Sequence, residues 1–150
     1  MTKKESISDF LSQRKLAIVG MSRTKNNFGN AVFKELMAKG YDVFPVHPEA
    51  DTIKGARCWP DFGGLPERVG GVVVVVPPAE TEKVVEQALA AGITRVWMQQ
   101  GAESPTAVRY CEENRMSVVQ HECILMHAEP VGWFHGAHRW LWGLFGKLPK

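Results

Sequence analysis

The stretch LAIVGMSRTKNNFG, residues 16–29, decides the fold that this sequence predicts. It opens with an apolar run over 16–19, which is typical of a strand buried on both faces. Gly20 ends the run and permits a tight turn, and the polar residues 21–27 follow. From Phe28 onward apolar residues recur at helical spacing. The stretch therefore predicts a buried strand, a turn and a helix in direct succession.

Strands and helices alternate along the rest of the chain. Further strands are predicted at 41–46, 71–76, 94–99 and 117–120. Helices are predicted at 6–13, from 28 to Gly40 with Asn26 or Asn27 as its cap, at 80–91 and at 104–115. The valines at 72–76 offer no polar side to water, so their strand is expected at the centre of the sheet. This alternation predicts an α/β fold with a doubly wound, five-stranded parallel sheet and helices on both faces.

Two regions fall outside this alternation. Residues 49–70 are less regular, and Pro60 and Pro66 allow short helical turns at most. Near the C-terminus, residues 131–146 predict a helix that carries the aromatic residues of Trp133 to Phe145 on one face. That helix is expected to pack on its own sheet, to form a homo-oligomer contact, or to act as a lid or a membrane-surface anchor.

Composition narrows the classes of function. The 150 residues suit one domain, and a net charge of +2 gives no field strong enough to indicate nucleic acid. The cysteines Cys58, Cys111 and Cys123 do not form a disulfide pattern, and their spacing matches no standard zinc motif. No signal-peptide core and no apolar stretch long enough to span a bilayer is evident, so a cytoplasmic location without a transmembrane segment is expected.

In a fold of this class, ligands bind beyond the carboxyl ends of the strands. The five ends predicted to share that edge are 20–29, Val46-His47-Pro48, Val76-Pro77-Pro78, Gln99-Gln100-Gly101 and Glu122-Cys123-Ile124. The first end combines a glycine turn with the start of a helix, whose unpaired N–H groups and positive dipole end attract anions. Ser22 adds a hydroxyl, and Arg23 and Lys25 add positive charge, so this end predicts a phosphate site.

Two common phosphate motifs do not match this turn. The residues after Gly20 break the dinucleotide pattern G-x-G-x-x-G at its second glycine, and the phosphate loop G-x-x-x-x-G-K-[ST] is absent. The second strand ends in Val46-His47-Pro48, where a domain that binds NAD would place an acid for the ribose. An NAD(P)-linked oxidoreductase, with Arg23 and Lys25 on a 2′-phosphate, stays as an alternative.

These strand ends together resemble the small stand-alone CoA-binding proteins and the CoA-binding domain of the succinyl-CoA synthetase α-subunit. The runs that carry the resemblance are 17–23, 40–48, Val76-Pro77-Pro78 and Gln100-Gly101. The resemblance covers about residues 10–126 and implies one Rossmann-like domain over 1–150, with coenzyme A or an acyl-CoA as its small-molecule ligand.

The resemblance also implies a set of binding residues. Those expected around the phosphates are Gly20, Ser22, Arg23 and Lys25, with Met21, Phe28 and Gly29 of the same turn. Val46, His47 and Pro48 are expected to border the adenosine. Val76, Pro77 and Pro78 are expected to form a wall along the diphosphate and pantetheine. Gln100 and Gly101 are expected to complete the edge.

Catalytic chemistry is not predicted. Cys123 falls where the synthetase has Asn-Cys-Pro-Gly, but Glu122, Ile124 and Leu125 differ from that pattern, so no acyl-transfer role is carried over. Cys123 is expected either to fill space as a small apolar residue or to meet the CoA thiol in a mixed disulfide. Neither a catalytic residue nor a metal ligand is assigned. The expected role is a CoA carrier, sensor or accessory module; the third hypothesis is a ligand-free interaction protein that works through 131–146.

Overall fold

A five-stranded parallel sheet forms the centre of the protein, in a computed structural model that describes residues 2–129. Its strands are β1 (Lys15–Val19), β2 (Asp42–Val46), β5 (Gly71–Val74), β6 (Arg95–Gln99) and β7 (Ser117–Glu122). They lie in the order β2-β1-β5-β6-β7 and all pair in parallel. The chain winds one way from β1 to β2 and the other way from β5 to β7. The predicted doubly wound α/β fold is confirmed, with its switch point between β1 and β5.

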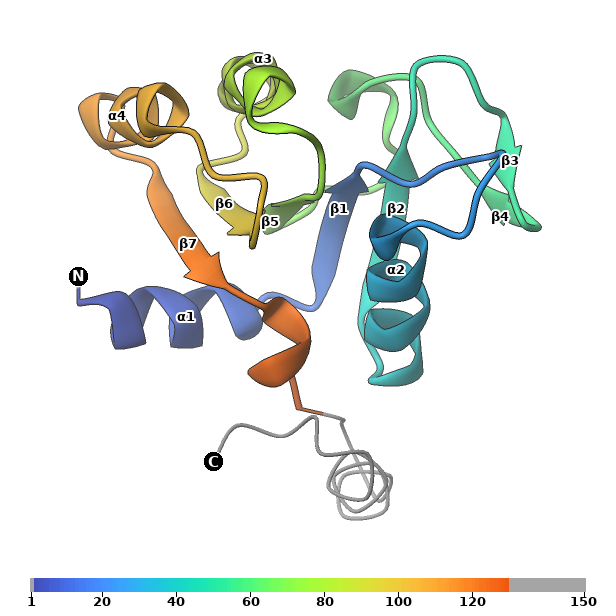
Figure 1. Cartoon of the computed structure of the whole chain (residues 1–150), viewed down its shortest axis with the longest axis horizontal. Helices are drawn as coiled ribbons and strands as arrows, with labels where there is room; N and C mark the ends of the chain where they lie inside the picture. Colours follow the sequence, from blue (N-terminus) through green and yellow to red (C-terminus); the bar gives the residue numbers. More distant parts are fainter. Residues whose placement is uncertain (1, 130–150) are drawn as a thin grey trace.

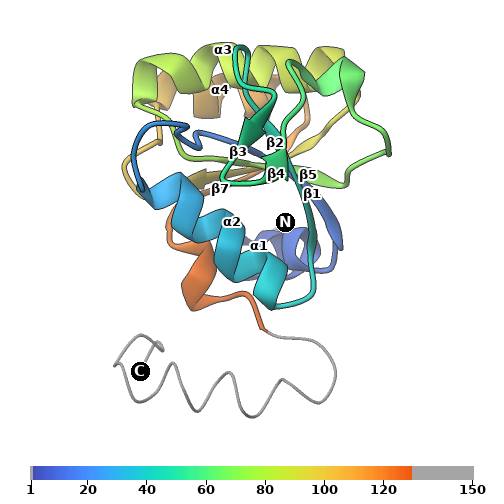
Figure 2. The ribbon, with the colours of Figure 1, turned by 90° about the vertical axis from the view of Figure 1, so that its right-hand side faces the viewer.

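Helices cover both faces of the sheet (Figure 1). The helices are α1 (Lys3–Leu11), α2 (Phe28–Ala38), α3 (Pro78–Ala90) and α4 (Pro105–Glu113). Figure 2 shows α3 and α4 together on one face and α1 and α2 on the other. Successive residues of a strand point to opposite faces of the sheet, so Ile18 packs in the core beside α1 and α2, and Ala17 packs in the core beside α3 and α4. The predicted helix at 131–146 lies outside the described residues.

Proline shifts two of the predicted boundaries. β5 ends at Val74 and not at Val76, although the Val75 N–H still donates to the Val19 carbonyl (2.8 Å). The chain then turns away, because Val76 is followed by Pro77 and Pro78, which cannot donate to a ladder. α3 begins at Pro78 and not at Glu80, since a proline at the first helical position loses no hydrogen bond.

Between β2 and β5 the chain forms small elements that alternation in sequence does not reveal. A two-stranded hairpin joins β3 (Thr52–Ile53) to β4 (Ala56–Arg57). The turn residues Lys54 and Gly55 both have positive φ, 49° and 84°, as a tight hairpin turn requires. A 3-10 turn, η1 (Phe62–Gly64), follows within the region where short helical turns are predicted.

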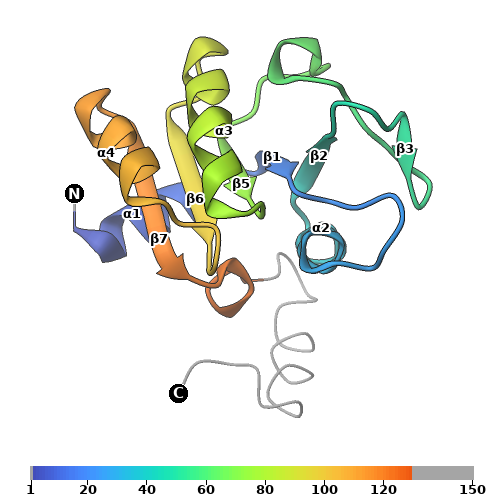
Figure 3. The same cartoon turned by 45° about the horizontal axis from the view of Figure 1, so that its top comes forward.

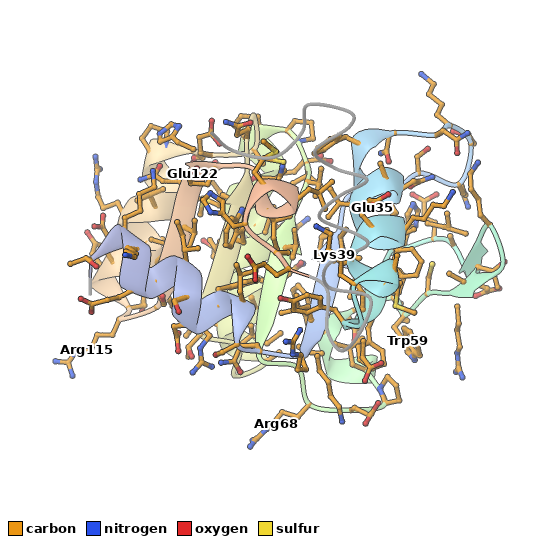
Figure 4. All side chains as sticks on the ribbon, turned by 90° about the horizontal axis from the view of Figure 1, so that it is seen from below. Glu35, Lys39, Trp59, Arg68, Arg115 and Glu122 are labelled. Atoms are coloured by element: carbon orange, nitrogen blue, oxygen red, sulfur yellow. The ribbon has the colours of Figure 1, made fainter. Side chains whose placement is uncertain are left out.

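The segment after β7 is tied to α2. A short 3-10 turn, η2 (Ile124–Met126), follows the strand, and the buried Lys39 amine donates to the carbonyls of Leu125 (3.4 Å) and Ala128 (2.8 Å). Figure 4 places Lys39 on α2 beside η2. Within residues 2–129, no helix has the length and apolar character needed to cross a membrane.

Candidate binding site at the carboxyl edge of the sheet

A crevice of about 580 Å³ opens at the switch point, beyond the carboxyl ends of β1, β2 and β5. The predicted residues that line it are Gly20, Met21, Val46, His47, Pro48, Val76 and Pro77. Its other walls come from η1 and its flanks and from the inner face of α3, namely Pro60, Asp61, Phe62, Glu80, Lys83, Val84 and Gln87. The fold thus gathers three of the strand ends around one space.

Two glycines allow the backbone segments around the crevice to touch. Gly20 has φ of 125°, and a Cβ atom there would collide with the carbonyl of Val75. A Cβ atom on Gly29 would collide with the carbonyl of Gly20. The end of β1, the exit of β5 and the first turn of α2 are therefore in backbone contact, which is the role that glycines serve in nucleotide-binding turns.

Asn30 fixes the loop between β1 and α2. Its Oδ1 accepts the Ser22 N–H (2.8 Å), and its Nδ2 donates to the carbonyls of Ser22 (2.9 Å) and Lys25 (3.0 Å). The side chain is 8% exposed and uses both its acceptor and its donor group here. In Figure 3 the loop it holds arcs between α2 and β3. One buried amide therefore sets the shape of the turn that is predicted to hold phosphate.

The first turn of α2 presents unpaired amides. The Asn27 side chain accepts the Asn30 N–H (2.9 Å) and donates to the Gly20 carbonyl (2.7 Å). This cap satisfies the third helical amide, and the helix geometry leaves the N–H groups of Phe28 and Gly29 without an intrahelical acceptor. An anion is favoured at such a position by both the N–H groups and the helix dipole.

Charged and hydroxyl groups lie on the loop above these amides. The Ser22 hydroxyl accepts the N–H groups of Thr24 (3.2 Å) and Lys25 (3.1 Å) and also shares a hydrogen bond with the Thr24 hydroxyl (3.3 Å), so it shapes the turn. Arg23 forms an exposed ion pair with Glu49 after β2 (2.9 Å). The Lys25 side chain is exposed at the outer end of the loop.

The end of β2 carries a histidine with one nitrogen already engaged. His47 Nδ1 accepts the N–H groups of Glu49 (3.1 Å) and Ala50 (3.0 Å). In the neutral ring this places the proton on Nε2, which is then the donor of the side chain. Glu49 and Asp61 also line the crevice, so acids are present near the position where the sequence alone shows His47 and Pro48.

At the end of β6, where Gln100 and Gly101 are predicted to complete the edge, the buried residue is Gln99. Gln100 is exposed, and the N–H of Gly101 is taken by the Glu103 carboxylate (3.2 and 3.1 Å). Gln99 is 1% exposed; its Oε1 accepts the Ile124 N–H (2.9 Å), and its Nε2 has no hydrogen-bond partner in the part of the chain that the structure describes. Pro78 is the first residue of α3. The predicted site residues that do not line the crevice are Ser22, Arg23, Lys25, Phe28, Gly29, Pro78, Gln100 and Gly101.

A larger cavity of about 730 Å³ lies at the opposite, amino edge of the sheet. Two of the cations that line it are paired, Lys15 with Glu67 (2.6 Å) and Arg95 with Asp9 (2.8 Å). Arg68, which also lines it, extends away from the body of the protein in Figure 4. It includes no helix start with unpaired amides, so the smaller crevice is the better candidate for an anionic ligand.

A doubly wound sheet with a glycine turn and a helix start at its switch point defines a nucleotide-binding class of domain. The chain matches the CoA binding domain family over residues 14–129. It therefore belongs to the CoA-binding domain family, as the sequence resemblance implies.

The chain is similar to two kinds of protein. A conserved hypothetical protein from Pyrococcus furiosus is 38% identical, with a TM-score of 0.70, covering 75% of this chain and 97% of that one. A hypothetical protein from Pyrococcus horikoshii OT3 is 31% identical, with a TM-score of 0.75, covering 83% and 88%. The uncharacterized protein YneT of Bacillus subtilis is 27% identical over 125 residues, 81% of this chain and 90% of YneT.

The second kind consists of much longer proteins. An ADP-forming acetate–CoA ligase of Methanocaldococcus jannaschii is 30% identical over 74 residues, which is 49% of this chain and 10% of the ligase. The chain spans about a tenth of the length of the acetate–CoA ligases that it matches.

Proposed function

We propose that the chain binds coenzyme A or an acyl-CoA through its nucleotide diphosphate at the switch-point crevice, as a carrier, sensor or accessory module. The observation that carries the proposal is the first turn of α2, where Phe28 and Gly29 have N–H groups without an intrahelical acceptor and Asn30 fixes the preceding loop. Membership of the CoA-binding domain family supplies the ligand class.

Each part of the ligand has a matching surface in this proposal. The diphosphate lies at the start of α2, with Lys25 as an exposed counter-charge. The adenosine lies in the crevice between the end of β2 and the face of α3 that lines it. This crevice has a volume of about 580 Å³ and is partly apolar. The pantetheine arm leaves past Val76 and Pro77, over the ends of β5 and β6.

A module role is favoured over a complete enzyme by the chemistry of the lining. The one histidine of the crevice, His47, already uses Nδ1 to accept two backbone amides. No cysteine, serine or threonine lies among the residues that line this crevice, so a hydroxyl or thiol nucleophile paired with that histidine is missing from its lining. We therefore assign binding to the site and no reaction.

Calorimetric titration tests the proposal with CoA, ADP, pantetheine and NADPH as separate ligands. CoA and ADP are expected to bind and to compete, whereas pantetheine alone binds at least about tenfold more weakly because it lacks the diphosphate. Absence of heat with CoA at high micromolar concentration would remove the proposal. Binding of NADPH but not CoA would favour the oxidoreductase alternative.

A matched pair of lysine variants locates the site. Lys25→Ala removes a cation beside the proposed diphosphate and is expected to weaken CoA binding about fivefold, an effect of about 1 kcal/mol. Lys34→Ala removes an equally exposed cation from the body of α2 and is expected to leave the affinity unchanged. Equal effects of the two variants would place the ligand elsewhere.

A further inference from the structure

We propose that Cys123 is a second, covalent contact for the ligand, which forms a mixed disulfide with the CoA thiol by exchange with a CoA disulfide. The proposal rests on the proposed function, because the nucleotide must be held at the crevice for its thiol to be delivered. It assigns a redox-dependent attachment site that non-covalent binding does not require.

Both peptide groups that flank Cys123 are held by buried side chains of β6. Trp97 Nε1 donates to the Glu122 carbonyl (3.0 Å), and Gln99 Oε1 accepts the Ile124 N–H (2.9 Å). Trp97 is fully buried and Gln99 is 1% exposed, so the surrounding residues restrict the movement of both side chains. The backbone position of Cys123 is therefore fixed from both sides.

An irregularity in β7 brings Cys123 to this position. Trp97 pairs with Val119, but Gln99 pairs with Glu122, so β7 inserts an extra residue against β6. His121, inside the irregular stretch, has φ of 60°, a conformation that residues with a Cβ seldom adopt. Bulges of this kind re-aim the end of a strand and recur beside functional sites.

Gln99 carries a buried donor that no acceptor within residues 2–129 satisfies. Its Nε2 has no hydrogen-bond partner among these residues, although its Oε1 is held at the Cys123–Ile124 peptide. Buried amide donors are nearly always satisfied, so an unpaired one calls for an outside acceptor. The pantetheine arm carries two amide carbonyls, which are acceptors of the required kind.

The distance across the sheet suits the length of that arm. Cys123 follows β7, which is three strands from β1 at one edge of the crevice. Three inter-strand spacings amount to about 14 Å. An extended pantetheine arm has a length of that order, so a diphosphate at the start of α2 allows its thiol to reach the end of β7. Figure 3 shows η2, which begins directly after Cys123, at the end of β7.

The three thiols differ in access. Cys58 is 6% exposed and Cys111 is fully buried, and burial raises the pKa of both thiols, to about 11 for Cys111. Cys123 is partly exposed. The thiolate is the attacking species in disulfide exchange, so Cys58 and Cys111 serve as internal controls for a reaction at Cys123.

The exchange step is balanced without a further oxidant. The Cys123 thiol gives its proton to solvent, and its sulfur attacks one sulfur of a CoA disulfide. The sulfur–sulfur bond of that reagent breaks, a new bond joins Cys123 to one CoA, and the second CoA leaves as a thiolate. The Cys123 sulfur passes from the thiolate to the disulfide level while the sulfur of the departing CoA passes from the disulfide to the thiolate level, so the exchange is redox-neutral overall.

The experiment measures the rate of adduct formation on the full chain by intact mass and peptide mapping. CoA disulfide is compared with pantethine, which has the same disulfide arm and no nucleotide. We expect one adduct, on Cys123, formed at least about tenfold faster from CoA disulfide because the nucleotide delivers the thiol, and slowed by excess ADP. Cys123→Ser is expected to form no adduct, and Cys111→Ser to react like the parent.

The outcomes separate this proposal from the proposed function. Equal rates with the two disulfides, or an adduct mainly on Cys58 or Cys111, overturns the covalent contact. Calorimetry with CoA on Cys123→Ser then tests whether CoA binds without the covalent bond. Binding that is retained in the variant supports the proposed function, whereas the absence of binding in both the parent and the variant rejects the proposed function. Gln99→Leu, checked for native circular dichroism, is expected to reduce the rate advantage of CoA disulfide at least about threefold.

Discussion

Replacement of Asn30 by alanine tests whether the shape of the loop after β1 serves the ligand. The Asn30 side chain makes three hydrogen bonds to backbone groups of Ser22 and Lys25. A typical hydrogen bond contributes about 1 kcal/mol net, so the loop loses about 3 kcal/mol of ordering free energy. If that ordering must be restored when CoA binds, the affinity falls roughly a hundredfold.

The substitution is informative because it spares the helix. The Asn27 cap bonds the backbone N–H of residue 30 and not its side chain, so the cap survives. Alanine is also a better helix former than asparagine, by about 0.6 kcal/mol, so α2 itself is not weakened. A loss of affinity therefore reports on the loop.

The assay pairs calorimetry with urea unfolding. Asn26→Ala is the matched control, because Asn26 is exposed and its side chain makes no hydrogen bond within residues 2–129. It is expected to bind CoA like the parent. The reasoning is refuted if Asn30→Ala unfolds cooperatively and still binds CoA within about threefold of the parent affinity.

Three further substitutions test separate contacts. Gly29→Ala is expected to lower the free energy of unfolding by about 1–3 kcal/mol, because the added Cβ meets the Gly20 carbonyl. Gly63→Ala is the control, since a Cβ there makes only ordinary contacts and is expected to change the free energy of unfolding little. Equal urea midpoints for the two variants would contradict this prediction. Glu122→Gln is expected to lower stability by up to about 1 kcal/mol at neutral pH, since the hydrogen bond with His127 and the Lys3 amine hold the pKa of Glu122 below its ordinary value. That difference is present above the ordinary carboxyl pKa and is lost as the pH falls through the lowered one, so urea midpoints that differ equally at every pH would exclude the ion pair as its cause. Glu49→Gln releases Arg23 and removes an acid from the crevice, and is expected to strengthen CoA binding about threefold in low salt by calorimetry; weaker binding would show that Glu49 holds the ligand.

The sheet was predictable because its signals are local. β1, β2, β5 and β6 are short, largely apolar runs with a glycine or a proline near the end, and the all-apolar composition of β5 predicts its burial on both faces. The valines at 72–76 predict the central strand correctly but not its end, because Val75 and Val76 are apolar whether or not they pair. Only the geometry imposed by Pro77 and Pro78 decides where the ladder stops.

The site was predictable only in part, for a related reason. Gly20 and the strand ends are found from sequence because a parallel sheet brings its carboxyl ends to one edge. The far wall of the crevice comes from residues 60–62 and the inner face of α3, and no local pattern places those beside His47. Asn30 looks like an ordinary helical residue, and its three bonds to the preceding loop appear only when the helix folds back on the end of β1.

At the end of β6, a difference of one position along the strand decides which glutamine is buried beside Cys123. Gln99 and Gln100 are adjacent and identical in type, so sequence favours neither as the buried one. Strand alternation would place Trp97 and Gln99 on one face, and the extra residue in β7 lets both of them hold the peptide groups around Cys123.

The Arg23–Glu49 pair would keep a cation available to the proposed phosphate site without a strong field. Both side chains are exposed, 48% and 68%, so the pair contributes at most about 1 kcal/mol and is readily exchanged. A diphosphate carries more charge than one carboxylate and offers Arg23 bidentate acceptors. In the proposed complex Arg23 would therefore gain by leaving Glu49 for the ligand, while the amides of Phe28 and Gly29 bear no charge that needs neutralising in the free protein. Under this proposal the selection of an anion rests on backbone geometry, which is consistent with a chain whose net charge is only +2.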